Sequence, residues 1–148
     1  MTELRYFEDI TPGSRDLGDQ VVVDGDEMLA FARQWDPVPI HVDPKAAEAL
    51  GGLTAPGLYI LALKQRLIHR LPFRPALIGS AGYDEVRFFR PVFAGDRLTL
   101  AVDWLESRHS RTKEDRGVVI HRLSLLDDQG ETVMSHLDTL IVRRRTAG

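Results

Sequence analysis

Gly57-Leu-Tyr-Ile-Leu-Ala-Leu-Lys-Gln-Arg-Leu-Ile-His-Arg-Leu71 is apolar on nearly every side when it is written as a helix. A helix with this pattern is typically buried all round, whereas a surface helix has a single apolar stripe. Pro72 and Pro75 follow, and proline does not continue a helix because it lacks an N–H and clashes with the preceding turn. The sequence therefore predicts a buried central helix from Gly57 to Leu71, around which the rest of the chain must fold.

The chain after this helix alternates between apolar and polar residues, which is typical of strands with one buried face. The alternation is clearest over 97–104, where leucine, valine and tryptophan occupy every second position. Asp127-Asp-Gln-Gly130 is a hairpin turn signal between two further apolar runs. The expected strands are 20–23, 81–89, 97–104, 118–126 and 132–142. Such strands are long enough to curl, so the predicted fold class is α+β, with a long central helix wrapped by a curved antiparallel sheet of about five strands.

Two shorter helices are expected before the central one. Asp24-Gly-Asp-Glu27 has the spacing of a capping box, in which the aspartate side chain accepts from the glutamate N–H. Apolar residues at helical spacing over 28–35 form one stripe, and Pro37 then disfavours helix in the residue before it. Asp43-Pro44 is typical of a helix start and Gly51-Gly52 of a helix end, which predicts a second, short helix between them.

Length and charge limit the classes of function. The 148 residues suit one domain, 1–148. The chain has 19 Lys and Arg against 22 Asp and Glu, and this net negative charge is the wrong sign for a protein that binds a nucleic-acid backbone. It has no cysteine, which excludes disulfides, thiolate metal sites and a cysteine nucleophile. We find no signal peptide or membrane span, so we expect a soluble cytoplasmic domain with no nucleic-acid or membrane partner.

Trp35-Asp-Pro-Val-Pro-Ile-His-Val-Asp43 carries the strongest candidate for chemistry. Its prolines fix φ and favour extended backbone in the residues before them, so Asp36 and His41 should project from a stiff loop that cannot become helical. Imidazole exchanges a proton near neutral pH and a carboxylate can hold a water, so the pair could activate one water molecule. The alternative is that both side chains cap loop amides. A metal site is disfavoured, because no second histidine or carboxylate cluster supplies the remaining ligands.

Three separated segments resemble one protein family. They are Phe31-Ala-Arg-Gln-Trp-Asp-Pro-Val-Pro-Ile-His-Val-Asp43, Gly51-Gly-Leu-Thr-Ala-Pro-Gly57 and Val86-Arg-Phe-Phe-Arg-Pro-Val92, the last followed by Gly95-Asp96. In this order they resemble the MaoC-like acyl-CoA hydratases and dehydratases, in a variant branch with the pattern D-P-x-P-x-H. The resemblance extends roughly over residues 5–143. It implies the hot-dog fold, in which an antiparallel sheet wraps around a long helix. This agrees with the architecture expected from periodicity.

The resemblance also implies roles for individual residues. Asp36 and His41 fall on family residues that act on the water added to a trans-2-enoyl thioester, and Gly57 falls on the glycine whose N–H polarises the thioester carbonyl. A helix N-terminus has free N–H donors for such an oxygen, and glycine permits close approach. The implied substrate is a coenzyme A thioester, with no cofactor and no metal. Family members pair through their sheets, which implies a homodimer or a dimer of dimers with the acyl channel near the seam.

Three alternatives stay open at this stage. Gly57 could merely allow tight packing where the central helix enters the sheet. A hot-dog thioesterase uses the same glycine with a carboxylate that directs water at the carbonyl, and Asp36 would serve that reaction equally well. A non-catalytic acyl-binding module would explain Val38 and Pro56, which stand where the family usually has Asn and where it commonly has His or Ser. Retention of both Asp36 and His41 favours catalysis over binding alone.

The remaining histidines and a basic run are interpreted as structural. His69, His109, His121 and His136 are scattered along the chain, and we expect each to be exposed or fully hydrogen-bonded. Arg143-Arg-Arg145 is typical of a solvated tail. Its alternative role is contact with the phosphates of coenzyme A, for which arginine is well suited.

Overall fold

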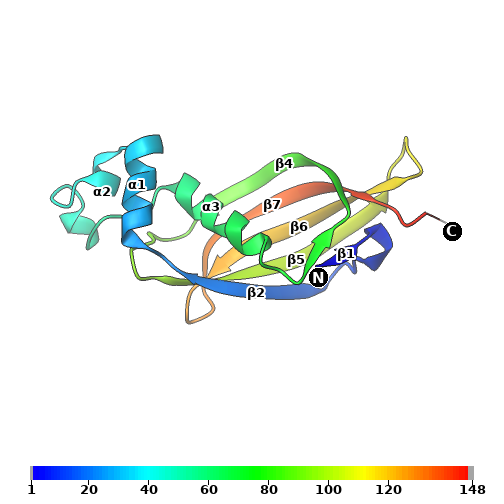
Figure 1. Ribbon diagram of the computed structural model, residues 1–148, viewed down its shortest axis with the longest axis horizontal. Coiled ribbons are helices and arrows are strands. Elements are labelled where there is room, and N and C mark those ends of the chain that lie inside the picture. The colour runs from blue at the N-terminus through cyan, green and yellow to red at the C-terminus, as the bar shows by residue number, and fades with distance from the viewer. Residues whose placement is uncertain (1, 147–148) are drawn as a thin grey trace.

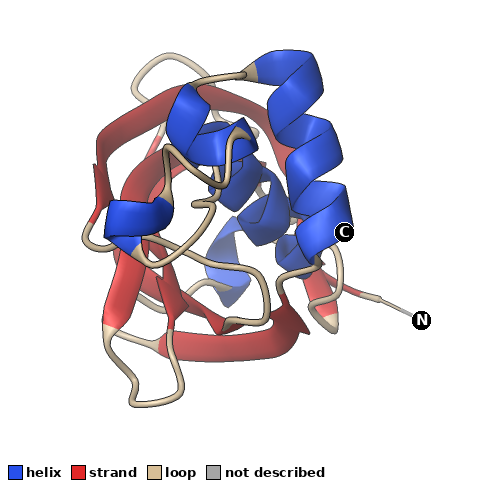
Figure 2. Cartoon of the chain, turned by 90° about the vertical axis from the view of Figure 1, so that its left-hand side faces the viewer, coloured by secondary structure: helices blue, strands red, loops and turns tan. Residues whose placement is uncertain are grey.

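The computed structural model describes residues 2–146 and centres on a five-stranded antiparallel sheet with the order β2-β5-β6-β7-β4. The strands are β2 (Arg15–Val22), β4 (Leu77–Phe88), β5 (Arg97–His109), β6 (Arg116–Leu126) and β7 (Thr132–Arg143). The helix α3 (Gly57–Ile68) lies across the concave face of this sheet (Figure 1). Viewed from one end, the strands curl around the helix (Figure 2). The predicted α+β architecture is therefore confirmed.

Several strands begin earlier than the alternation predicted, and two short ones were missed. β2 starts at Arg15 rather than at 20, because a bulge between Leu17 and Gln20 interrupts its pairing with β5 and hides the pattern. The strands β1 (Glu3–Arg5) and β3 (Phe73–Pro75) pair in parallel as a small separate sheet. Three residues are too few for periodicity to be recognised, so neither strand was predicted.

The central helix differs from the prediction in its end and in two side chains. α3 ends at Ile68 rather than at Leu71, because the chain turns there toward β3. Leu58 is exposed, so the helix is not buried on every side. Lys64 is as deeply buried as the neighbouring Leu63, with 1% of its surface exposed. The buried face of α3 therefore includes a charged group that apolar patterning alone does not explain.

The first helix, α1 (Gly25–Trp35), begins where the capping sequence predicted. The Asp24 side chain accepts from the Glu27 N–H at 3.2 Å. The Glu27 carboxylate accepts from the hydroxyl of Tyr59 at 2.6 Å and pairs with Arg66 at 3.0 Å. Since Tyr59 and Arg66 belong to α3, the first turn of α1 is joined to the central helix by a hydrogen bond and an ion pair.

The segment between α1 and α3 differs from the prediction in two places. Pro39–Val42 forms one turn of helix, α2, where a non-helical loop was expected. Proline at the first helical position loses no hydrogen bond and already has a helical φ, which explains the turn. The short helix expected from Asp43-Pro44 to Gly51-Gly52 is replaced by turns and a 3-10 helix over Glu48–Leu50. The Asp43 side chain closes a local turn with the N–H two residues later, so it does not start a helix.

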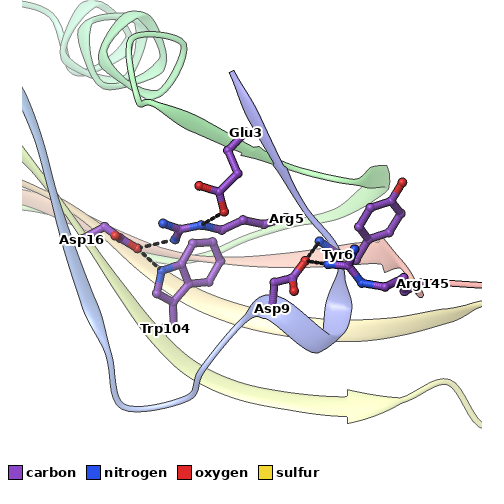
Figure 3. A network of polar contacts seen from close by, with 7 residues as sticks. All are labelled: Glu3, Arg5, Tyr6, Asp9, Asp16, Trp104 and Arg145. Carbon is purple, nitrogen blue, oxygen red and sulfur yellow. Dashed lines mark hydrogen bonds and ion pairs between the residues drawn. The ribbon is translucent and has the colours of Figure 1, made fainter. Parts of the chain in front are cut away.

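The N-terminal segment is held against the sheet by a network of polar contacts (Figure 3). Asp16 accepts from Arg5 Nη1 at 2.9 Å and from Trp104 Nε1 at 2.7 Å. One carboxylate thus joins β1, β2 and β5. This fixes β1 at the end of the sheet that lies away from α1 (Figure 1).

The basic run near the end of the chain is not the solvated tail that was expected. Arg144 pairs with Glu8 at 3.1 Å, and Arg145 pairs with Asp9. Acidic residues near the start of the chain therefore engage these two arginines. Within residues 2–146, no helix is long and apolar enough to cross a membrane.

Gly117 on β6 allows the N-terminal segment to approach the sheet closely. A Cβ atom at this position would overlap ring carbons of Phe7, which is buried. We expect Gly117→Ala to lower the free energy of unfolding by about 1–3 kcal/mol, the usual effect of overpacking. Gly79→Ala is the matched control, because Gly79 also lies in a strand and, among the described residues other than its chain neighbours, no atom is within 4 Å of its Cβ position. Urea unfolding measures both variants, and equal stabilities would contradict the prediction.

Candidate active site

Asp36 and His41 are brought together at the junction of α1 and α2. Asp36 is the C-terminal cap of α1, and His41 lies in the single turn of α2. Oδ2 of Asp36 and Nε2 of His41 are 3.8 Å apart. The His41 side chain is 12% exposed and that of Asp36 is 36% exposed. The two residues therefore form an acid–imidazole pair that is accessible from the Asp36 side.

Thr54 fixes the orientation of the His41 imidazole. Nδ1 of His41 lies 2.7 Å from the backbone oxygen of Thr54 and 3.0 Å from its hydroxyl. A carbonyl oxygen only accepts hydrogen bonds, so Nδ1 carries the ring proton and donates it. In the neutral ring, Nε2 then has a free lone pair, which lies on the side of Asp36. Thr54 was not predicted, because it lies thirteen residues away and a lone threonine gives no signal in a sequence.

Gly57 is linked to this pair through the segment that contains Thr54. The Thr54 N–H donates to the carbonyl of Ile40 at 3.1 Å, so this segment is bound directly to α2. Gly57 follows three residues later as the first residue of α3, which places it within about 11 Å of Thr54. Within residues 2–146, no backbone carbonyl accepts from the Gly57 N–H, as expected for the first turn of a helix.

Exposed apolar side chains lie next to Asp36 and Gly57. Trp35 precedes Asp36 and was predicted on the buried stripe of α1, but it is 63% exposed at the last position of that helix. Leu58 follows Gly57 and is also exposed. The ring of Phe88 lies over Gly57, where a Cβ atom would be 2.8 Å from its Cζ. These side chains, called the apolar rim below, provide a surface that an apolar ligand could cover.

Comparison with known proteins identifies the family. The family model described as "MaoC like domain" matches residues 9–123. The chain belongs to the MaoC-like domain family. The matched region contains Asp36, His41 and Gly57.

Individual relatives of this MaoC-like domain agree with that assignment. The UPF0336 protein of Streptomyces avermitilis is 33% identical over 122 residues, which cover 76% of the chain and 78% of that protein. The crystal structure of the MaoC-like dehydratase from Rhodospirillum rubrum is 30% identical, with a TM-score of 0.85 over 96% of the chain and 99% of that protein. R-hydratase PhaJ1 from Pseudomonas aeruginosa is 20% identical and has a TM-score of 0.71 over 95% of the chain and 86% of that protein. These likenesses confirm the predicted hot-dog fold.

The MaoC-like domain also contains a cavity of about 690 Å³ at the C-terminal end of α3. The polar residues that line it include Ser80, Tyr83, His121 and Asp138, which we call the polar cluster. His121 and Asp138 lie opposite each other on β6 and β7. None of the four was predicted as a site residue. The sequence does contain one indication of them: His121 and Asp138 each occur in a run of mostly apolar residues, where a polar side chain is unusual.

His121 and His136 correct the prediction for the scattered histidines. Both are buried, and each has one ring nitrogen without a hydrogen-bond partner within residues 2–146, Nδ1 in His121 and Nε2 in His136. Burial lowers the pKa of His121 to about 4, although the carboxylate of Asp138 lies 3.9 Å away. Burial also lowers the pKa of His136. The prediction that these two side chains are exposed or fully hydrogen-bonded was wrong, whereas His69 and His109 are exposed as expected.

Proposed function

We propose that this MaoC-like domain catalyses the reversible hydration of an enoyl thioester to a 3-hydroxyacyl thioester. The observation that carries the proposal is the arrangement of Asp36 and His41. An ionised Asp36 carboxylate and the free lone pair on His41 Nε2 are two acceptors 3.8 Å apart. Two acceptors at that separation can each take one hydrogen of a single water molecule, which orients its oxygen for attack.

The proposed reaction needs one proton to be removed and one to be supplied. In the hydration direction, the water oxygen bonds to the β-carbon while the Asp36–His41 pair takes a proton from that water. The electrons of the double bond move toward the thioester carbonyl, which forms an enolate, and the pair returns a proton to the α-carbon. Dehydration is the reverse sequence. The single turn of α2 starts at Pro39 and restricts the motion of His41. Less orientational entropy of this side chain then has to be lost when it reacts.

Gly57 is proposed as the donor that stabilises the enolate oxygen. Its N–H lies at the start of a helix of twelve residues, where unpaired N–H groups and the helix dipole favour negative charge. Glycine has no side chain to block a thioester that approaches the backbone. A hydrogen bond that strengthens as the enolate forms lowers the barrier more than it improves substrate binding.

Gly57→Ala is expected to lower turnover much more than it weakens binding of a saturated acyl-CoA. The added methyl group would meet the ring of Phe88, which is partly exposed and can turn aside, so the variant should fold. The methyl group then stands beside the N–H that the enolate would use. Steady-state kinetics on an enoyl-CoA and calorimetry with the saturated chain measure the two effects. Equal losses in turnover and in affinity would favour a binding module instead.

The proposed substrate is an acyl-CoA-type thioester, without a separate cofactor or metal. The pair supplies the base that activates water, so the mechanism does not require a Lewis acid. The apolar rim offers contact for an acyl chain, and the MaoC-like dehydratase from Rhodospirillum rubrum is similar over nearly its whole length. Both observations support this class of substrate.

One assay separates hydration from thioester hydrolysis. A panel of enoyl-CoA and acyl-CoA substrates is incubated with the protein, and the enoyl absorbance and the release of free thiol are followed together. Hydration predicts loss of the enoyl absorbance with no thiol. Release of thiol with no change at the double bond would instead establish a hydrolase in which Asp36 directs the water.

We expect the protein to be a homodimer or a dimer of dimers that pairs through β4. This strand lies at the edge of the sheet, so one side of its backbone has no partner strand in the sheet. It also carries exposed apolar residues, among them Leu77, Ile78 and Phe88. An edge of this kind usually needs to be covered. Sedimentation equilibrium should give at least twice the mass of the chain, and a monodisperse monomer would contradict the prediction.

A further inference from the structure

The cavity of about 690 Å³ has the size of a small-molecule site. It lies between the C-terminal end of α3 and the sheet, and Leu4 of β1 forms part of its wall. The wall is mostly apolar, and its buried residues include Val102, Leu123 and Leu140. An apolar group could fill most of this space, but the polar cluster would then lie against it.

The polar cluster has hydrogen-bonding capacity that the protein itself does not use. The Ser80 hydroxyl donates to Oδ1 of Asp138 at 2.7 Å, while Oδ2 of Asp138 is 3.9 Å from Nε2 of His121. Nδ1 of His121 is buried and has no hydrogen-bond partner among the residues that the structure describes. The Tyr83 hydroxyl accepts from Nζ of Lys64 at 3.0 Å, which leaves its own hydrogen able to donate. A buried unpaired group such as this His121 nitrogen destabilises a fold unless a ligand or water satisfies it, whereas Ser80 and Tyr83 are exposed.

The buried charges beside the polar cluster favour a neutral ligand group, because the two arginines that also line the cavity, Arg74 and Arg143, are exposed. The carboxylate of Asp138 and the ammonium of Lys64 have opposite signs and interact, since Asp138 raises the pKa of Lys64 against the larger effect of burial. A charged ligand would add an uncompensated buried charge. A hydroxyl group both donates and accepts, so it could donate to Asp138 and accept from Tyr83. An alcohol therefore fits this cluster better than a carboxylate or an amine.

The cavity and the proposed site lie along the same helix, α3, and the same strand, β4. Phe88 of β4 lies against Gly57, and Tyr83 of β4 contacts Lys64, so the helix and the strand face each other at two points. Between Gly57 and Gln65, which lines the cavity, the helix rises about 12 Å. An extended chain of about ten carbons, with bonds near 1.5 Å, spans that distance.

We propose that the polar cluster binds a hydroxyl group at the far end of the acyl chain. The preferred substrates are then long acyl thioesters with a terminal hydroxyl, rather than plain chains of equal length. This inference rests on the proposed function, because it takes the thioester carbonyl to lie at Gly57.

Calorimetry with two acyl chains of equal length tests the inference. The full chain is titrated with dodecanoyl-CoA and with 12-hydroxydodecanoyl-CoA. Neither can be hydrated, so the comparison of affinities does not depend on turnover. We expect the hydroxylated chain to bind at least about tenfold more tightly, the effect of one hydrogen bond to a charged group. Equal affinities, tighter binding of the plain chain, or no binding of either would overturn the inference.

Three variants test whether the preference for the hydroxylated chain depends on the polar cluster. Asp138→Asn and Tyr83→Phe should each remove most of the preference for the hydroxylated chain, and Tyr83 is half-exposed, so its variant should fold. Asp103→Asn is the matched control, because Asp103 lies on β5 and pairs with Arg15 outside the cavity. An unchanged preference in both cluster variants would overturn the inference. If the protein hydrates no enoyl thioester but keeps the preference, the proposed reaction is wrong and the role of the cluster stands.

Discussion

Asp36→Asn and His41→Gln are each expected to reduce the hydration of an enoyl-CoA by about 10²–10⁴-fold, the range for loss of one acid–base group. Asn cannot serve as a base, and Gln cannot exchange a proton. Both replacements keep the approximate size of the side chain, and Asp36 is partly exposed. We therefore expect the melting temperature to be nearly unchanged. Steady-state kinetics on a substrate that the wild type hydrates measures the loss.

Asp43→Asn is the matched control for both variants. Asp43 lies two residues from His41 and its side chain only closes a local turn. This variant should keep nearly full activity. Full activity in Asp36→Asn or in His41→Gln would show that the assigned role is wrong. A similar loss in Asp43→Asn would show that the assay responds to the shape of the segment rather than to the pair.

Lys64→Met is expected to raise the free energy of unfolding at pH 7 by about 3 kcal/mol. Burial lowers the pKa of Lys64 from 10.5 to about 8, and each unit of such a shift corresponds to about 1.4 kcal/mol. The folded protein holds this proton less tightly than the unfolded chain. The destabilisation is therefore greatest below pH 8 and disappears as the pH rises toward 10.5. Methionine fills the same space without a charge.

Urea unfolding at pH 7 and pH 9.5 checks this prediction. For the wild type, the contribution of Lys64 should raise the stability by about 2 kcal/mol between these two pH values. Lys64→Met should lack that rise, and Lys113→Met, which changes an exposed lysine, should retain it. A loss of stability in Lys64→Met at pH 7 would mean that the contact with Tyr83 outweighs the burial of the charge.

The central helix and the main strands could be predicted because their apolar patterns are long and regular. The turn of helix at Pro39 was predicted wrongly, since proline both restricts the residue before it and suits the first position of a helix. Local sequence rules do not show which of these two effects of proline is larger at Pro39. The exposed Trp35 has a similar cause, because periodicity does not reveal where a helix extends beyond the core.

The Asp36–His41 pair was predicted from local spacing, but the residues around it depend on tertiary structure. Thr54 reaches His41 only because the segment before α3 binds the backbone of α2. Counting back from the turn between β6 and β7 would pair His121 with Leu137 rather than with Asp138. A bulge at Leu125 and Leu126 shifts that count by one, so the sequence alone would have paired the wrong residues.

The two tryptophans of the chain give it two optical reporters in very different surroundings. Trp104 is buried and donates to Asp16 (Figure 3). Its ring centroid lies 5.0 Å from that of His121. It also lines the cavity, so its fluorescence should respond to whatever fills that space. Trp35 is exposed beside Asp36 and should respond to events at the pair. A Trp35→Phe protein would therefore report occupancy of the cavity alone, in real time and without a label.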